Sequence, residues 1–194
     1  MCGISGIYSS QAIEETLIHK FNRALAHRGP DGEGYAFFEE QRLALAHRRL
    51  SILDLSDAGN QPMYSANRRY CIAYNGEVFN FIEIRQELEK LGQKFISNSD
   101  TEIILAAYET WGMPAFHKFN GMWAIALWDE VEKKLLLCRD RFGIKPFYYA
   151  YEKGKYLAFA SETNAFTRLE PLYKREIDVE KFKIAEADTY ALCG

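Results

Sequence analysis

The sequence contains few cysteines, and they are far apart. Its 194 residues include only four. They are Cys2, Cys71, Cys138 and Cys193. This spacing forms neither a CxxC metal motif nor the dense pattern of a disulfide-stabilised secreted domain. A reducing compartment therefore suits the chain best.

Long apolar runs and an excess of one charge are also missing. No stretch approaches the roughly 20 apolar residues of a membrane span, and no charged segment followed by an apolar run indicates a signal peptide. The formal net charge is −3, and acidic and basic residues are spread along the whole length, so no basic patch is available for nucleic acid. We expect a cytoplasmic protein that binds neither nucleic acid nor a membrane.

Enough apolar material is present for one sizeable core. Hydrophobic residues make up 48% of the chain and aromatic residues 14%, which is a globular composition. Apolar residues recur at helical spacing in three segments, the second after the capping pair Asn80 and Glu83 and the third after a capping box at 99–102. The predicted helices are 13–25, 81–91 and 100–111.

Strand patterns lie among these helices and dominate the second half. One strand is expected to start at Cys2, and another to end at the dipeptide Asn75-Gly76. The predicted strands are 2–8, one that begins at Leu43, 70–74, 122–129, 135–138, 147–151 and 156–160. Because the helices are concentrated in the first 112 residues, with strands both among and after them, we expect an α+β layered fold with largely antiparallel sheets.

Cys2 is the first candidate for chemistry. If Met1 is removed, this residue carries a thiol and a free α-amine, and an amine that titrates near pH 8 can accept the thiol proton directly or through one water. Gly3 and Gly6 let the neighbouring backbone approach a ligand closely. The alternative interpretation is an ordinary buried cysteine, which is the common fate of this residue type.

Attack by a thiol on a carbonyl creates an oxyanion, which requires fixed hydrogen-bond donors. The side-chain amide of Asn75 and the open main chain of Gly76 can supply two donors at one point. The alternative is a plain Asn-Gly turn.

Three charged residues are candidates for binding the two ends of an amino-acid substrate. Arg49 can hold a carboxylate through its planar guanidinium, although such an arginine is more often a surface ion-pair partner. Asp100 can hold an ammonium group, although its place at a helix start also suits an acid for structural reasons. Glu77 is a weaker candidate for the same role.

Taken together, these segments resemble class II glutamine amidotransferases of the asparagine synthetase type. The resemblance covers residues 2–166 and leaves 167–194 as a poorly matched C-terminal segment, the start of a linker or of an absent synthetase domain. Asn98 also stands where the family has a glycine. The matching motifs, in family order, are Cys2-Gly3-Ile4, His27-Arg28-Gly29-Pro30-Asp31, Arg49-Leu50-Ser51-Ile52, Gln61-Pro62, Tyr74-Asn75-Gly76-Glu77, Ser99-Asp100-Thr101-Glu102, Arg139-Asp140-Arg141-Phe142-Gly143-Ile144-Lys145-Pro146 and Ala160-Ser161-Glu162.

The resemblance implies a fold and a role for each site residue. The fold is the N-terminal-nucleophile four-layer α/β/β/α sandwich with two mostly antiparallel sheets. Cys2 corresponds to the nucleophile, and Asn75 and Gly76 to the oxyanion donors. Arg49 corresponds to the residue that receives the glutamine α-carboxylate. The other implied pocket residues are the backbone of Leu50, Ser51, Ile52 and Leu53, and Glu77 and Asp100 near the α-amine.

The implied reaction is hydrolysis of L-glutamine to glutamate and ammonia. In the family the ammonia passes to a synthetase domain or subunit, where Mg-ATP activates an aspartate carboxylate as an adenylate before amidation. Neither a Ser-Gly-Gly-x-Asp-Ser loop nor a Walker-type GxxxxGK[ST] loop occurs here, so we expect that domain to be absent. No metal or organic cofactor is expected for the glutaminase step. The resemblance also allows a homodimer.

Other interpretations remain open at this stage. The chain can be an isolated fragment, a truncated product or a stand-alone glutaminase that serves a different acceptor, such as a sugar or purine precursor. It can also be a non-catalytic module of the same fold, for which a retained Met1 would be the sign, because the cysteine amine would then be blocked.

Overall fold

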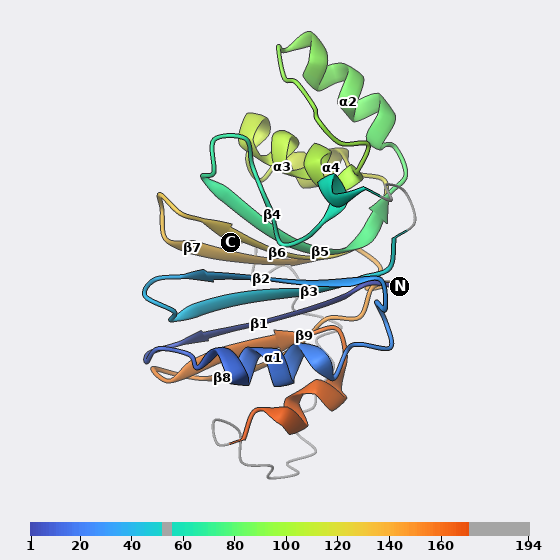
Figure 1. The fold of residues 1–194 in the computed structure, drawn as a ribbon. Helices are drawn as coiled ribbons and strands as arrows, with labels where there is room; N and C mark the ends of the chain where they lie inside the picture. Colours follow the sequence, from blue (N-terminus) through green and yellow to red (C-terminus); the bar gives the residue numbers. More distant parts are fainter. Residues whose placement is uncertain (52–55, 171–194) are drawn as a thin grey trace.

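The computed structural model describes residues 1–51 and 56–170 (Figure 1). Two β-sheets lie face to face in the middle of the molecule, and helices cover the outer face of each sheet (Figure 1). The predicted candidates Ile52 and Leu53, and almost all of the segment 167–194, lie outside the described residues.

The first sheet has five strands in the order β2-β3-β1-β9-β8. Every neighbouring pair is antiparallel. The strands are β1 (Gly3–Ser9), β2 (Gly32–Phe38), β3 (Leu43–Arg49), β8 (Tyr148–Glu152) and β9 (Tyr156–Ala160). Because β1 lies between β3 and β9, the start of the chain is held in the centre of a sheet and does not fray.

The second sheet has four strands in the order β4-β5-β6-β7, again all antiparallel. The strands are β4 (Met63–Tyr64), β5 (Tyr70–Val78), β6 (Gly121–Asp129) and β7 (Lys134–Arg139). β6 and β7 form the hairpin that the sequence predicts.

Helices flank this pair of sheets on both sides. α1 (Glu15–Arg23) and the 3-10 helix η2 (Thr163–Arg168) cover the first sheet, and α2 (Phe81–Lys90), α3 (Asp100–Trp111) and α4 (Ala115–Lys118) lie beyond the second (Figure 1). A further 3-10 turn, η1 (Asp57–Gly59), precedes β4. Among the described residues, no helix is both long and apolar enough to cross a membrane.

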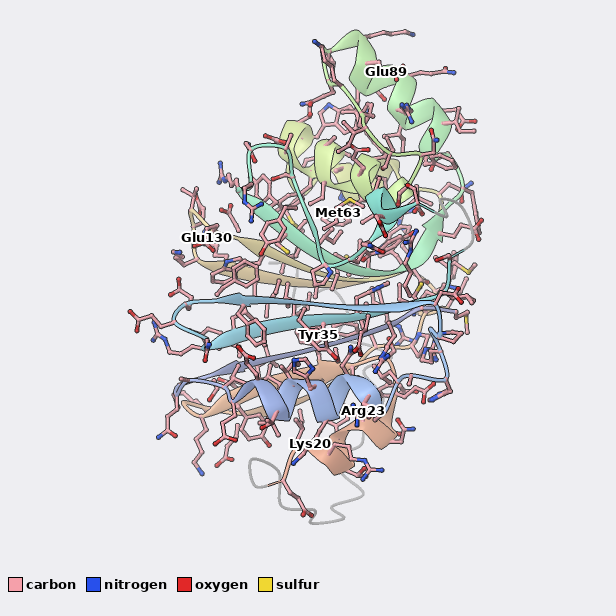
Figure 2. The ribbon with its side chains drawn as sticks, viewed as in Figure 1. Lys20, Arg23, Tyr35, Met63, Glu89 and Glu130 are labelled. Atoms are coloured by element: carbon pink, nitrogen blue, oxygen red, sulfur yellow. The ribbon has the colours of Figure 1, made fainter. Side chains whose placement is uncertain are left out.

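Side chains pack into three apolar layers. The middle layer joins the two sheets, and Figure 2 shows side chains filling this space, while Lys20, Arg23 and Glu89 extend outward from the helices. One outer layer lies under α1 and η2, and the other under α3 and α4. Members of the middle layer include Ile4, Leu43, Leu45, Cys71, Trp128 and Phe159.

One predicted boundary is wrong at the point that matters for chemistry. β5 does not end at Asn75-Gly76 but continues to Val78. Asn75 pairs with Ala124 and Gly76 pairs with Trp123 on β6, so the dipeptide is part of the ladder. The interpretation of a plain Asn-Gly turn is therefore wrong. Pairing with β6 overrides the local preference of this dipeptide for a turn.

The predicted helix caps form only in part. Ser99 accepts a hydrogen bond from the Thr101 N–H at 3.2 Å, as expected, but the Glu102 carboxylate accepts from the Ile96 and Ser97 N–H groups instead of returning to Ser99. The Asn80 side chain makes no cap hydrogen bond to α2. It donates to the Lys118 carbonyl and accepts from the Asn120 N–H, which joins the start of α2 to the start of β6.

Candidate functional site

Cys2 directly precedes β1 and is held by contacts from two other segments. Its carbonyl accepts a hydrogen bond from Arg28 Nε at 2.9 Å. Its Sγ accepts from the Leu50 N–H at 3.4 Å, immediately after β3. Unlike Cys71 and Cys138, which are buried, Cys2 is partly exposed, so the interpretation of an ordinary buried cysteine is wrong.

β3 brings the start of β1 to the same place as Asn75 and Gly76. His47 on β3 pairs with Ile4, and its Nε2 lies 3.1 Å from the Tyr74 carbonyl oxygen on β5. Because the Tyr74 carbonyl contacts His47, the β3 partner of Ile4, the residues next to Tyr74 lie opposite the start of β1. The predicted oxyanion donors therefore directly follow, on β5, a residue that contacts the β3 partner of Ile4, and Cys2 lies two residues before Ile4.

Asn75 and Gly76 are both tightly constrained. Packing alone explains why position 76 is a glycine, but it does not explain the buried, unpaired amide of Asn75. The Asn75 side chain is 1% exposed, and its Nδ2 has no hydrogen-bond partner in the described structure. Such an unpaired donor is costly unless a ligand satisfies it. A Cβ on Gly76 would lie 2.5 Å from the Tyr74 ring and 2.8 Å from Trp123 Cα, so no other residue fits.

Arg49 ends β3 and is nearly buried, at 9% exposed. Its Nη1 donates to the Ser56 carbonyl at 2.9 Å and to Asn60 Oδ1 at 2.6 Å. This burial contradicts the interpretation of a surface arginine. The loop around η1 instead holds the guanidinium at the end of β3.

Asp100 opens α3 and is 4% exposed. Its Oδ2 accepts from the Tyr74 hydroxyl at 2.7 Å and from the Val78 N–H at 3.0 Å, so it joins α3 to β5. Burial raises the pKa of Asp100, and the negative charge of Glu77 adds to the rise. Burial also raises the pKa of Tyr74, with smaller contributions from Asp100, Glu77 and the Cys2 thiol, so these groups form one cluster.

Leu50 and Ser51 form the described part of the predicted pocket backbone. Leu50 contacts the Cys2 sulfur, as given above, and the Ser51 N–H donates to Asp31 Oδ2 at 2.8 Å. The Asp31 N–H in turn donates to the Arg49 carbonyl at 3.0 Å. The turn before β2 therefore fixes the path of the chain just after β3.

His47 is a buried histidine that the sequence analysis did not single out. It is 1% exposed, and burial lowers the pKa of its imidazole to about 3. The ring is therefore neutral at physiological pH. Since Nε2 faces the Tyr74 carbonyl, Nε2 carries the proton and donates it.

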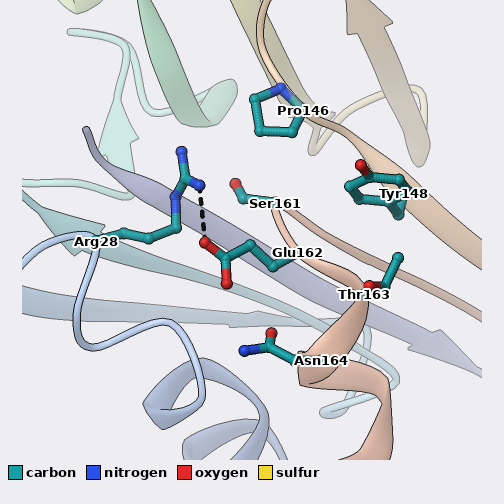
Figure 3. A pocket seen from close by; sticks show the side chains of 7 residues that line it. All are labelled: Arg28, Pro146, Tyr148, Ser161, Glu162, Thr163 and Asn164. Carbon is teal, nitrogen blue, oxygen red and sulfur yellow. Dashed lines mark hydrogen bonds and ion pairs between the residues drawn. The ribbon is translucent and has the colours of Figure 1, made fainter.

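A pocket of about 380 Å³ is lined in part by Arg28, which also donates to the Cys2 carbonyl, and Figure 3 shows its lining. Arg28, which holds the Cys2 carbonyl, forms an ion pair with Glu162 at 2.9 Å, and His27 lies 3.0 Å from the same carboxylate oxygen. Although burial opposes the shift, these two neighbours lower the pKa of Glu162. The lining residues are Arg28, Pro146, Tyr148, Ser161, Glu162, Thr163 and Asn164.

None of the predicted site residues lines this pocket. Ser161 nevertheless supports the site, because its Oγ accepts from the Ile4 N–H at 2.9 Å and its own N–H donates to the Ile4 carbonyl. Arg28, Ser161 and Glu162 belong to motifs that the sequence analysis quoted without giving them a role. Within 1–51 and 56–170, no group of three or more His, Cys, Asp or Glu side chains is arranged to hold a metal ion.

Comparisons with known proteins identify the family of the chain. A family model described as a glutamine amidotransferase domain matches residues 1–190. Asparagine synthetase [glutamine-hydrolyzing] 1 of Bacillus subtilis is 37% identical over 93% of this chain and 28% of its own length. A putative asparagine synthetase [glutamine-hydrolyzing] of Methanocaldococcus jannaschii is 38% identical over 91% of this chain and 37% of its own length. The chain thus spans about a third of these relatives.

A solved structure gives the fold independently. Glutamine phosphoribosylpyrophosphate amidotransferase of B. subtilis superposes with a TM-score of 0.76 at 22% identity, over 87% of this chain and 43% of that one. The layer order of sheets and helices described above agrees, so the N-terminal-nucleophile α/β/β/α sandwich expected from the sequence is confirmed. The chain belongs to the glutamine amidotransferase domain family.

Proposed function

We propose that this chain hydrolyses the side-chain amide of L-glutamine, with Cys2 as nucleophile after removal of Met1. The observation that carries the proposal is the buried Asn75 Nδ2, which has no hydrogen-bond partner among the described residues and follows Tyr74, whose carbonyl contacts the β3 partner of Ile4. A site that stabilises an oxyanion needs such a fixed donor before the substrate arrives.

The first chemical step transfers the Cys2 thiol proton to the Cys2 α-amine, while the sulfur attacks the amide carbon of glutamine. The carbonyl oxygen becomes an oxyanion, which Asn75 Nδ2 and the Gly76 main chain stabilise. The protonated amine then donates to the leaving nitrogen as the carbon–nitrogen bond breaks, which releases ammonia and leaves a γ-glutamyl thioester. The same amine next accepts a proton from water, and hydroxide attack on the thioester gives glutamate and restores the thiol.

Charged residues of both signs in the proposed site support an amino acid as substrate. The Arg49 guanidinium suits the α-carboxylate, since two parallel N–H groups match two carboxylate oxygens. Glu77 and Asp100 on the β5 side suit the α-ammonium group. The backbone of Leu50, which contacts the Cys2 sulfur, and of Ser51 is proposed to line the same site. No metal or cofactor enters these steps.

The ammonia is proposed to serve ATP-dependent amidation of aspartate to asparagine. This part rests on the relatives, of which the chain spans 28% and 37%. The proposed partner is therefore a synthetase domain or subunit that binds Mg-ATP. A cytoplasmic location and a homodimer are further expectations, which fractionation and light scattering test directly.

A different acceptor is the second candidate. An enzyme called amidase chry2, from Gibberella zeae, is 35% identical over 86% of this chain, so close relatives do not all carry the name asparagine synthetase. Supplying candidate acceptors together with the partner synthetase and ATP distinguishes the two. Amide formation on aspartate supports the first candidate, and amide formation only on another acid supports the second.

The hydrolysis itself is tested with the purified chain. Intact mass first establishes whether Met1 has been removed, and glutamate release from L-glutamine is then measured for the wild type, Cys2→Ala and the control Cys138→Ala, which lies in the layer under the helices of the second sheet. We expect loss of activity only for Cys2→Ala. Activity that survives this change contradicts the proposal, and a processed but inactive wild type favours the non-catalytic alternative.

A further inference from the structure

Lys145 is a buried lysine without an acidic partner. Its residue is 5% exposed, and no ion pair joins it to a carboxylate within the described ranges. Buried lysines are rare and are usually paired, because an unpaired charge in the interior is costly. The hydrogen bond described for its Nζ goes to Met1 Sδ, at 3.3 Å.

The loop after β7 fixes the main chain of Lys145. The Asp140 carboxylate accepts from the Lys145 N–H at 2.9 Å and from the Ile144 N–H at the same distance. Arg139 Nε donates to the Lys145 carbonyl at 2.6 Å. With its backbone held on both sides, Lys145 directs its side chain toward the start of the chain.

Removal of Met1 therefore removes the hydrogen-bond acceptor described for Lys145 Nζ. The thioether is a weak acceptor, and it belongs to the residue that must leave before Cys2 has a free amine. The short covalent path from Met1 Sδ to the Cys2 nitrogen places Nζ within roughly 10 Å of that nitrogen. Processing removes the thioether and leaves the new α-amine within that distance of the Lys145 ammonium.

We propose that Lys145 is a positioning residue for glutamine hydrolysis, whose positive charge favours the reactive, singly deprotonated state of processed Cys2. This inference rests on the proposed function. In acid, Cys2 carries both an ammonium group and a thiol. The reactive form has one proton fewer, whichever of the two atoms keeps the remaining one, so a nearby positive charge favours it in either case.

The size of the effect follows from Coulomb's law. At about 10 Å and an effective dielectric constant between that of a protein surface and that of water, one charge shifts a titration by roughly half a pH unit to one unit. The acid limb of the pH–rate profile should therefore lie that much lower with Lys145 than without it.

Other charges near Cys2 are already engaged. On one side, Arg28 pairs with Glu162, which also contacts His27. In the loop itself, the Asp140 carboxylate is occupied by main-chain N–H groups, and Arg139 by main-chain oxygens. On the β5 side lie Tyr74, Glu77 and Asp100, with Arg49 at the end of β3. Because Lys145 holds no carboxylate, its charge can be removed without leaving an unpaired acid behind.

The test compares Lys145→Met, which keeps the length of the side chain, with Lys145→Arg, which keeps its charge. The control is Lys118→Met, an exposed lysine paired with Glu87. Glutamate release from L-glutamine is measured between pH 5 and 9 in processed protein, verified by intact mass. We expect the acid limb of kcat/KM to move up by roughly 0.5 to 1 unit in Lys145→Met alone, with rates that converge above the limb.

Three results overturn the inference: an unchanged acid limb in Lys145→Met, an equal shift in Lys118→Met, and an equal shift in Lys145→Arg, which keeps the charge. An unchanged limb together with a lower melting temperature in both Lys145 variants shows a structural role only. If Lys145→Met does not fold, Lys145→Gln takes its place with the same expectation. A wild type that is processed but releases no glutamate at any pH overturns the proposed function itself, and is distinguishable because every variant is then equally inactive.

Discussion

The imidazole of His47 contacts the main-chain oxygen of Tyr74 at 3.1 Å, so a side chain of β3 donates a hydrogen bond to β5 across the two sheets. Tyr74 directly precedes the proposed oxyanion donors, and Arg49 follows His47 by two residues. One hydrogen bond therefore fixes the spacing between the strand that carries Arg49 and the strand that carries Asn75.

The same histidine makes stability depend on pH. Burial lowers the pKa of His47 to about 3, whereas an unfolded histidine titrates near 6.5. Between these values the unfolded chain binds a proton that the folded chain does not, so this contribution to stability is full above pH 6.5 and is lost as the pH falls toward 3. The free energy of unfolding should fall by roughly 3 to 5 kcal/mol over this window on account of His47.

Denaturant unfolding at a series of pH values measures this slope. His47→Gln keeps a donor but cannot titrate, so we expect a less steep decline between pH 6.5 and 3 than in the wild type. The exposed His117, replaced in the same way, serves as control and should leave the slope nearly unchanged. Equal slopes in all three proteins would show that other groups cause the acid sensitivity.

Replacement of Gly76 by alanine tests how tightly β5 packs beside the site. A Cβ there would meet the Tyr74 ring at 2.5 Å and Trp123 Cα at 2.8 Å, whereas a Cβ at Gly32 would find its nearest neighbour at 3.8 Å. We expect Gly76→Ala to lower the free energy of unfolding by about 3 kcal/mol, and Gly32→Ala to change it by less than about 1 kcal/mol. Equal effects in thermal melts would contradict the packing argument.

The sequence was sufficient to predict most strands because their apolar residues alternate or form continuous runs. Ile4 and Ile7 place β1 correctly, and the run 122–129 places β6 within one residue of its observed start. By contrast, β2 (Gly32–Phe38) was not expected, because it begins with two glycines among polar residues and is defined by its pairing with β3. Long-range pairing of that kind leaves little local signal.

The site was predictable only in the residues whose chemistry is recognisable from type and position. Cys2 and Asn75 fall in that class. Arg28 and Ser161 do not. Arg28 donates to the Cys2 carbonyl and Ser161 accepts from the Ile4 N–H, and each comes from a segment far away in sequence. Spatial adjacency of this sort, like the unpaired state of Lys145, is visible only after folding.

Asp100, the proposed ammonium-binding residue, also joins α3 to β5. Because its Oδ2 accepts two hydrogen bonds, from the Tyr74 hydroxyl and the Val78 N–H, Asp100→Asn keeps the shape but can place an amide donor against those two donors. We expect a loss of about 1 to 3 kcal/mol in stability and a raised KM for glutamine. Glu83→Gln, on the exposed face of α2, is the matched control.

The pH dependence of this variant has a definite sign. Burial raises the pKa of Asp100, so the folded state binds a proton more readily than the unfolded one, and this contribution falls as the pH rises through the folded value. Asp100→Asn should remove that part of the slope on the acid side. Denaturant unfolding of both proteins from pH 3 to 7 measures it, and identical slopes would contradict the assignment.

Asn75 gives the sharpest separation of catalysis from binding. Its Nδ2 is buried and has no hydrogen-bond partner in the part of the chain that the structure describes, so Asn75→Ala removes an unused donor, and other residues are proposed to hold the substrate ends. We expect kcat to fall by about 10²- to 10³-fold with little change in KM, since the lost interaction forms only with the oxyanion. The exposed Asn67, replaced by alanine, should leave kcat unchanged. A rise in KM with unchanged kcat would place Asn75 in substrate binding instead, because only transition-state contacts lower kcat and kcat/KM together.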